Sequence, residues 1–163
     1  MAKDKVPVTP AVRVLRAEKV AFTPHLYAYE DKGGTAVCAR ELGFSEHAII
    51  KTLVMEDDRE NPLIVLMHGD RQVSTRELAR ILGVKSILPC SAEKASRLTG
   101  YLVGGTSPFG TKRVLPVYME EAILDLPRIY INGGKRGFLV GISPQDAERV
   151  LKPVLVHVAS QAD

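Results

Sequence analysis

The sequence of 163 residues has no tryptophan, and aromatic residues make up only 6% of it. Side chains that could form cross-links or a zinc site are sparse too. Cys38 and Cys90 are far apart and belong to no C-x-x-C motif, and the 4 histidines form neither H-x-H nor H-E-x-x-H. These absences argue against a disulfide scaffold and give a metal site little support, so we expect neither a metal nor a cofactor.

Long apolar runs are missing as well. The longest, "PLIVLM" and "PVLVHVA", are far shorter than the roughly 20 residues that a membrane-spanning helix needs. The opening segment, "MAKDKVPVTP", contains charges and proline but no apolar stretch of the kind that a secretory signal requires. We therefore expect a cytoplasmic location and no membrane partner.

The composition that remains is that of a globular protein. Apolar residues make up 45% and charged residues 25% of the chain, which are ordinary values. A chain of this length can bury most of its apolar surface in one core, and no linker, repeat or low-complexity stretch divides it, so we expect a single domain over residues 1–163. The net charge of +3 permits a polyanionic partner without requiring one.

Capping residues and apolar periodicity predict where the helices lie. Thr9 can cap a helix that has Pro10 at its first position. Thr35 can cap a second helix that stops at Gly43. Ser74 and Glu77 form a capping box at the start of a third helix. The predicted helices are residues 9–20, 35–43, 74–83, 91–98 and 143–152.

Apolar stretches bounded by turns predict the strands. They are residues 49–56, 63–68, 84–88, 114–119, 128–132, 138–142 and 154–159, with a further strand within 21–30. Pro24 should confine that further strand to a sheet edge. Hairpins at 49–68 and 128–142 interrupt a regular β-α-β rhythm. We therefore expect an α/β fold in which helices pack against either a mixed sheet or an open barrel.

One cation interrupts the apolar strand "IIKTLVME". Side chains alternate along a strand, so Lys51 points the same way as Ile49 and Leu53. A buried ammonium must find an anion, reach solvent at a strand end, or face a cleft where a ligand supplies negative charge. The last case would place Lys51 in a polar pocket, aimed at a phosphate or at a developing oxyanion.

The segment "TGYLVGGTSPFGTKR" is rich in glycine and has no acidic residue. Gly104 and Gly105 would let a ligand approach the main chain, where their N–H groups could donate to a carbonyl oxygen or a sugar hydroxyl. The segment is no Walker A motif, and it could also be an ordinary tight turn. Cys38 and Cys90 have no base nearby in sequence, so we expect any hydrolysis at this segment to rely on positioning, water and backbone donors.

Adjacent cations accompany two glycine-containing turns. Lys112 and Arg113 follow the segment just described, and Lys135 and Arg136 lie in "NGGKRG". Such pairs are either solvated turns or contacts for a polyanion.

In combination, "TPAV", "IIKTLV", "TGYLVGGTSPFGTKRVLP" and "IYINGGKRG" resemble the YbaK/EbsC family of aminoacyl-tRNA deacylases, which is related to the editing domain inserted in some bacterial prolyl-tRNA synthetases. The resemblance runs from about Thr9 to about Val158 and is closest to the free-standing Cys-tRNA(Pro) deacylases. It implies a single α/β domain with a mixed, barrel-like sheet flanked by helices.

The resemblance also implies a set of site residues. The implied catalytic positions are Lys51 and Gly104, and the implied substrate-binding positions are Tyr27, Thr52, Gly105 and Asn132. We expect Lys112, Arg113, Lys135 and Arg136 to contact phosphates at the acceptor end of a tRNA.

The implied reaction is cleavage of the ester that joins a wrong amino acid to tRNA(Pro), with the thiol of a misacylated cysteine as the attacking group. Prolyl-tRNA synthetase is an implied partner. Leu139 and Gly34 depart from the cysteine-specific pattern, so Ala and Ser stay open as substrates. The residues also leave open a non-catalytic RNA-binding or nucleotide-binding module, and a purely structural domain.

Overall fold

The structure is a computed structural model that describes residues 6–161. Residues 1–5, which form the first half of the "MAKDKVPVTP" segment considered for a signal, lie outside the described residues. Over residues 6–161, no helix combines the length and the apolar character that crossing a bilayer would need.

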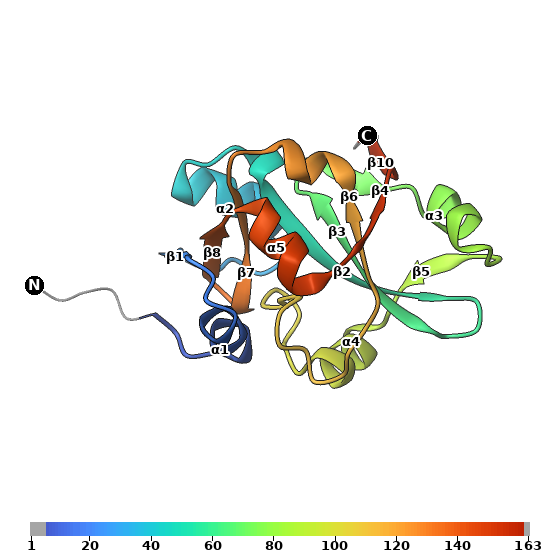
Figure 1. The fold of residues 1–163 in the computed structure, drawn as a ribbon, viewed down its shortest axis with the longest axis horizontal. Coiled ribbons are helices and arrows are strands. Elements are labelled where there is room, and N and C mark those ends of the chain that lie inside the picture. The colour runs from blue at the N-terminus through green and yellow to red at the C-terminus, as the bar shows by residue number, and fades with distance from the viewer. Residues whose placement is uncertain (1–5, 162–163) are drawn as a thin grey trace, which may run out of the picture.

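A mixed sheet forms the centre of the molecule (Figure 1). The strands of this 8-stranded sheet follow the order β1-β8-β7-β2-β3-β6-β9, and β5 pairs with β2 beside this path. Their bounds are β1 Thr23–Leu26, β2 Ile49–Asp57, β3 Pro62–His68, β5 Ile87–Pro89, β6 Val117–Glu120, β7 Ile129–Lys135, β8 Phe138–Ile142 and β9 Val154–Val156. The sheet stays open, with β1 and β9 at its ends, so Pro24 lies on an edge strand as the sequence predicted.

Both faces of the sheet are covered, which explains the unbroken apolar run of β3. Ile64 and Leu66 pack into the main core, while Val65 and Met67 pack into a second core on the opposite face. The helices are α1 Pro10–Ala17, α2 Gly34–Leu42, α3 Thr75–Leu82, α4 Ala92–Thr99 and α5 Pro144–Leu151, and the short 3-10 helices are η1 Glu46–Ala48 and η2 Glu121–Asp125. Cys38 of α2 packs in a third, smaller cluster with Ile49 and Leu139. The predicted mixed sheet flanked by helices is confirmed.

The capping predictions are confirmed with one exception. Thr9 Oγ1 accepts from Val12 N–H at 3.1 Å, and Ser74 Oγ accepts from Glu77 N–H at 3.3 Å. Thr35 is the exception, because α2 begins one residue earlier, after Gly33, with no side-chain cap. Thr35 Oγ1 instead donates to the Glu46 carboxylate at 2.7 Å, since the η1 turn brings that acceptor next to α2.

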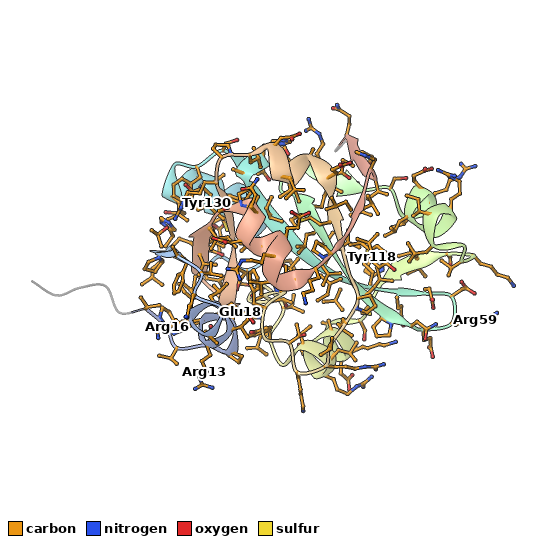
Figure 2. The ribbon with its side chains drawn as sticks, in the orientation of Figure 1. Arg13, Arg16, Glu18, Arg59, Tyr118 and Tyr130 are labelled. Atoms are coloured by element: carbon orange, nitrogen blue, oxygen red, sulfur yellow. The ribbon has the colours of Figure 1, made fainter. Side chains whose placement is uncertain are left out.

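The sequence analysis missed a small ribbon of two strands, β4 Arg71–Val73 and β10 Ala159–Gln161, which pair antiparallel. Each strand is too short and too polar to show an apolar alternation. The surface outside the sheet is rich in charge: Figure 2 shows Arg13 and Arg16 projecting from α1, and Arg59 at the tip of the β2–β3 hairpin.

Candidate active site

A cavity of about 560 Å³ lies beside the part of β2 that has no paired strand along one edge. Its walls come from the segment that links β1 to α2, from β2, from the start of α4, from the glycine-rich loop, and from β7 and β8. The deep wall is apolar, and Ile49, Val37 and Leu139 belong to it. The rim carries polar groups, which include Lys51 and Asn132.

The cavity coincides with a gap in the sheet. The parallel pairing of β2 with β7 ends at Ile50 opposite Ile131, and the antiparallel pairing with β5 begins only at Met55. Because backbone groups alternate between the two edges of a strand, and Val54 O accepts from Cys90 N–H on this edge, the backbone N–H and C=O of Thr52 face the gap. Thr52 Oγ1 is also buried and has no hydrogen-bond partner among the described residues.

The strand register brings Lys51 and Asn132 to the mouth of this gap. Ile50 and Ile131 are paired and share the main core, whereas their predecessors Ile49 and Tyr130 pack together on the other face. Side chains of neighbouring strands point the same way at paired positions, so Lys51 and Asn132 continue that second face side by side. Residues that are 81 positions apart in the sequence therefore line one wall.

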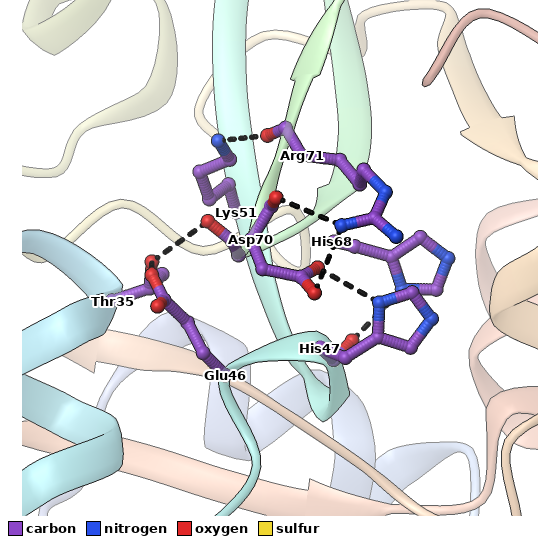
Figure 3. A network of polar contacts seen from close by, with 8 residues as sticks. Thr35, Glu46, His47, Lys51, His68, Asp70 and Arg71 are labelled. Atoms are coloured by element: carbon purple, nitrogen blue, oxygen red, sulfur yellow. Dashed lines mark hydrogen bonds and ion pairs between the residues drawn. The ribbon is translucent and has the colours of Figure 1, made fainter. Parts of the chain in front are cut away.

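The Lys51 ammonium lies in a network of polar groups (Figure 3). It donates to the carbonyl oxygen of Arg71, and no ion pair links it to a carboxylate among residues 6–161. Burial lowers the pKa of Lys51, while the nearby charges of Glu46 and Asp70 act to raise it. The ammonium thus has fixed negative charges around it and no partner that neutralises it directly.

Both of those carboxylates have other partners. Glu46 accepts from Thr35, and Asp70 Oδ1 lies 2.8 Å from His47 Nδ1 while its other oxygen accepts from Arg71 at 3.1 Å. Such hydrogen bonds fix the positions of the two carboxylates. The network therefore orients Lys51 without capturing its ammonium.

The glycine-rich loop meets this wall at Gly104. Asn132 Nδ2 donates to the Gly104 carbonyl at 3.2 Å, and Asn132 Oδ1 accepts from Gly134 N–H at 2.7 Å. Asn132 thus joins the loop to the β7–β8 turn. Gly104 has a φ of +90°, a conformation that L side chains rarely adopt. The tip of Tyr29 packs directly against its Cα.

Gly105 has a different place from the one that the sequence analysis expected. Its N–H donates to Leu102 O at 2.8 Å, so the expectation of a free donor at this position is wrong. A side chain on Gly105 would lie 2.7 Å from the backbone nitrogen of Arg136. Glycine at this position therefore allows close packing of two backbones, and Gly105 does not line the cavity.

The remaining predicted positions divide between wall and surface. Tyr27 lines the cavity, where burial and a contact with Cys38 raise the pKa of its phenol. Gly34 and Leu139, the two departures from the cysteine-specific pattern, also line it.

The basic turns lie farther out. Arg136 is exposed and contacts two residues of the cavity wall. Its Nε donates to Val103 O at 2.8 Å, and its guanidinium lies over the Tyr29 ring. Lys112, Arg113 and Lys135 are exposed and do not line the cavity. Sequence reasoning missed Tyr29, although it lies in the same alternating run as Tyr27.

Comparisons with known proteins show what the whole chain is similar to. Residues 30–150 match the aminoacyl-tRNA editing domain family. The chain is 30% identical over 147 residues to EbsC of Enterococcus faecalis, named as a candidate Cys-tRNA(Pro)/Cys-tRNA(Cys) deacylase, over 89% of this chain and 90% of that protein. It is also 30% identical over 148 residues to the proline–tRNA ligase of Thermodesulfovibrio yellowstonii. That alignment covers 88% of this chain but only 23% of the ligase.

Solved structures share the fold. The structure of a hypothetical protein aligns with a TM-score of 0.84 at 23% identity, over 93% of this chain and 100% of that one. The structure of a candidate trans-editing enzyme for prolyl-tRNA synthetase aligns with a TM-score of 0.79 at 19% identity, over 94% of this chain and 99% of that one. At these identities the two structures show the common fold alone.

Proposed function

Since the chain belongs to the YbaK/EbsC family of aminoacyl-tRNA editing domains, which is related to the editing domain of prolyl-tRNA synthetase, we propose that it is a trans-editing hydrolase that removes a wrong amino acid from tRNA(Pro). Cys-tRNA(Pro) is the leading substrate, because the relative EbsC is named for it. The observation that carries the proposal is the meeting of Lys51, Asn132 and Gly104 at the unpaired edge of β2.

The proposed reaction draws its nucleophile from the substrate. The cysteine thiol attacks the ester carbonyl, a sulfur–carbon bond forms, the bond from carbon to the ribose 3′ oxygen breaks, and the thiol proton ends on that oxygen. Water then opens the cyclic thioester to free cysteine. Holding the thiol against the carbonyl can lower the barrier by about 7 to 11 kcal/mol, and one well-placed oxyanion donor by about 3 to 4 kcal/mol.

The cysteines of the protein support this scheme by being poor nucleophiles. Burial raises the pKa of Cys38, and burial together with the charge of Glu56 raises the pKa of Cys90. Both thiols therefore stay protonated near neutral pH, and a thiol attacks a carbonyl far more slowly than a thiolate does. The role left to the protein is to position the acyl group and stabilise negative charge.

Lys51 is the group best placed for that charge. One of its three N–H donors goes to Arg71 O, which leaves two for an oxyanion. We expect Lys51→Met to lower turnover about 100- to 1,000-fold, as the loss of an oxyanion donor does elsewhere. Folding should not suffer, because burial already disfavours the ammonium. Lys85, which is exposed and outside the cavity, provides a matched control variant in Lys85→Met.

The apolar deep wall favours a small, uncharged amino-acid side chain. Leu139 and Gly34 lie at the two positions that depart from the cysteine-specific pattern, so alanine and serine are the competing substrates. A pocket of this kind discriminates a thiol from a methyl or hydroxyl group by roughly 1 to 3 kcal/mol. From binding alone we therefore expect a preference for cysteine of one or two orders of magnitude. The attacking thiol, which alanine and serine lack, should widen that preference.

A deacylation panel tests the function. Cys-, Ala-, Ser- and Pro-tRNA(Pro) are incubated separately with the wild-type protein, Lys51→Met and Lys85→Met, and the remaining ester is measured. Rapid loss of Cys-tRNA(Pro) that Lys51→Met abolishes, with circular dichroism unchanged, supports the proposal. Tight, salt-dependent tRNA binding without loss of any ester identifies a non-catalytic binding module instead. Adding prolyl-tRNA synthetase to the same assay tests the proposed partnership through a change in rate.

A further inference from the structure

Tyr29 forms part of the cavity wall between β1 and α2, and nothing in the proposed reaction uses it so far. Its ring bridges two segments that are distant in sequence. At its base, the Tyr29 Cβ lies 3.6 Å from the position that a Cβ of Gly137 would take. At its tip, Oη lies 2.5 Å from the position that a Cβ of Gly104 would take, so the hydroxyl touches the bare backbone of the loop.

The ring is held in this place from the other side as well. The Arg136 guanidinium carbon lies 5.1 Å from the Tyr29 ring centroid, which is a cation–π contact. Arg136 is itself tied to the loop, because its Nε donates to Val103 O at 2.8 Å. Tyr29 is therefore positioned by contacts with the β7–β8 turn, the loop and a fixed arginine.

The hydroxyl of Tyr29 has no hydrogen-bond partner among residues 6–161, although it borders the cavity. A phenol hydroxyl can donate one hydrogen bond and accept another. A positioned hydroxyl beside an exposed glycine backbone at a cavity rim is a binding feature for a ligand group that can do both.

The substrate offers one such group next to the ester. The ester carbonyl only accepts and the α-ammonium only donates, whereas the 2′-hydroxyl of the terminal ribose does both. The apolar depth of the cavity takes the amino-acid side chain, so the ribose lies at the rim, where Gly104 is exposed and Tyr29 half-buried. We propose that Tyr29 Oη binds the 2′-hydroxyl of the terminal adenosine and so orients the ester toward Lys51; this rests on the proposed function.

A double-mutant cycle tests the contact. The wild-type protein and Tyr29→Phe are assayed on Cys-tRNA(Pro) that ends either in adenosine or in 2′-deoxyadenosine. We expect Tyr29→Phe to lower kcat/KM about three- to tenfold on the natural end, as the loss of one neutral hydrogen bond would. On the 2′-deoxy end, where the partner is already missing, the two proteins should be equal. Losses that simply multiply would overturn the inference, because a general structural role predicts that result.

A binding measurement keeps the test independent of catalysis. Fluorescence anisotropy gives the affinity of each protein for an uncharged acceptor-stem hairpin with either end. The wild-type protein should prefer the 2′-hydroxyl end and Tyr29→Phe should not; equal preference in both proteins refutes the contact even if no ester is cleaved.

Two controls accompany these measurements. Tyr118→Phe, on β6 and outside the cavity (Figure 2), should match the wild type throughout, and the thermal midpoint of Tyr29→Phe should be unchanged because the ring remains over Arg136. If the wild type cleaves Cys-tRNA(Pro) while the cycle is additive, the inference about Tyr29 fails and the proposed function stands. If no ester is cleaved, the proposed function fails and the hairpin measurement decides the role of Tyr29.

Discussion

Replacing Gly104 by alanine is the sharpest test of how the loop is built. A Cβ at this position would lie 2.5 Å from Tyr29 Oη, 2.9 Å from Cε1 and 3.0 Å from Cζ. These separations are well inside ordinary van der Waals contact, so the Tyr29 ring must move. The Arg136 guanidinium stacked on that ring opposes the movement. The residue at 104 would also have to keep a φ of +90°.

Two terms set the magnitude. A left-handed conformation costs a non-glycine residue about 1 to 2 kcal/mol. Displacing Tyr29 adds the loss of its cation–π contact, about 0.5 to 1 kcal/mol at an exposed site. We therefore expect Gly104→Ala to lower the free energy of unfolding by about 1.5 to 3 kcal/mol, the sum of these terms.

Gly34 provides the matched control. It has a φ of +60° and lines the same cavity, but a Cβ there would meet nothing within 4 Å. Gly34→Ala should therefore show the conformational term alone, about 1 to 2 kcal/mol.

Urea unfolding followed by circular dichroism measures both variants, since the chain has no tryptophan to report by fluorescence. In a Tyr29→Ala background, the effect of Gly104→Ala should fall to that of Gly34→Ala. If Gly104→Ala destabilises no more than Gly34→Ala, or if its effect is undiminished without the Tyr29 ring, the contact described here does not hold the loop.

Three further predictions concern the site and its surroundings. Asn132→Asp keeps the oxygen that accepts from Gly134 N–H but replaces the donor to Gly104 O by a second oxygen. Urea unfolding should show that the free energy of unfolding falls by about 1 to 3 kcal/mol. An unchanged free energy of unfolding would contradict the hydrogen bond from Asn132 to Gly104. Replacing both Lys112 and Arg113 by alanine should weaken tRNA binding. The slope of log affinity against log salt concentration should become shallower by about 0.7 to 0.9 per lost phosphate contact. Arg59→Ala, at the tip of the β2–β3 hairpin, should leave that slope unchanged. Burial lowers the pKa of His68, so below the ordinary imidazole pKa of about 6.5 the unfolded chain binds a proton that the native state does not bind. The free energy of unfolding should therefore fall as the pH drops from about 7 to 5. Urea unfolding at several pH values should show a smaller fall in His68→Gln than in the wild type, and an equal fall in both proteins would rule this out.

Local signals were sufficient where one residue decides the structure. Thr9 and Ser74 cap their helices because a short side-chain oxygen lies next to free N–H groups, and Gly43 ends α2 in the left-handed conformation. The alternation of the β2 strand likewise placed Lys51 on the face of Ile49. In each case the physical cause lies within a few residues of the position it controls.

The parts that could not be predicted depend on register and on distant partners. That pairing with β7 stops at Ile50 is a property of two strands and cannot be read from either one. The carbonyl that receives Lys51 belongs to Arg71, in a strand too short to predict. Gly104 and Gly105 look equivalent in sequence, yet one borders the cavity and the other packs against the turn after β7.

The gap beside β2 links the stability of the sheet to its proposed chemistry. A reaction whose nucleophile comes from the substrate needs donors and acceptors that are already fixed before the substrate arrives. The edge at residues 51–54 meets this need, because pairing with β3 fixes one edge of the strand while the backbone groups of Thr52 face the gap on the other edge. A buried hydroxyl without a partner, such as Thr52 Oγ1, costs about 1 to 3 kcal/mol. A chain that continued the ladder past Ile50 would recover stability and close the space that the acyl group requires.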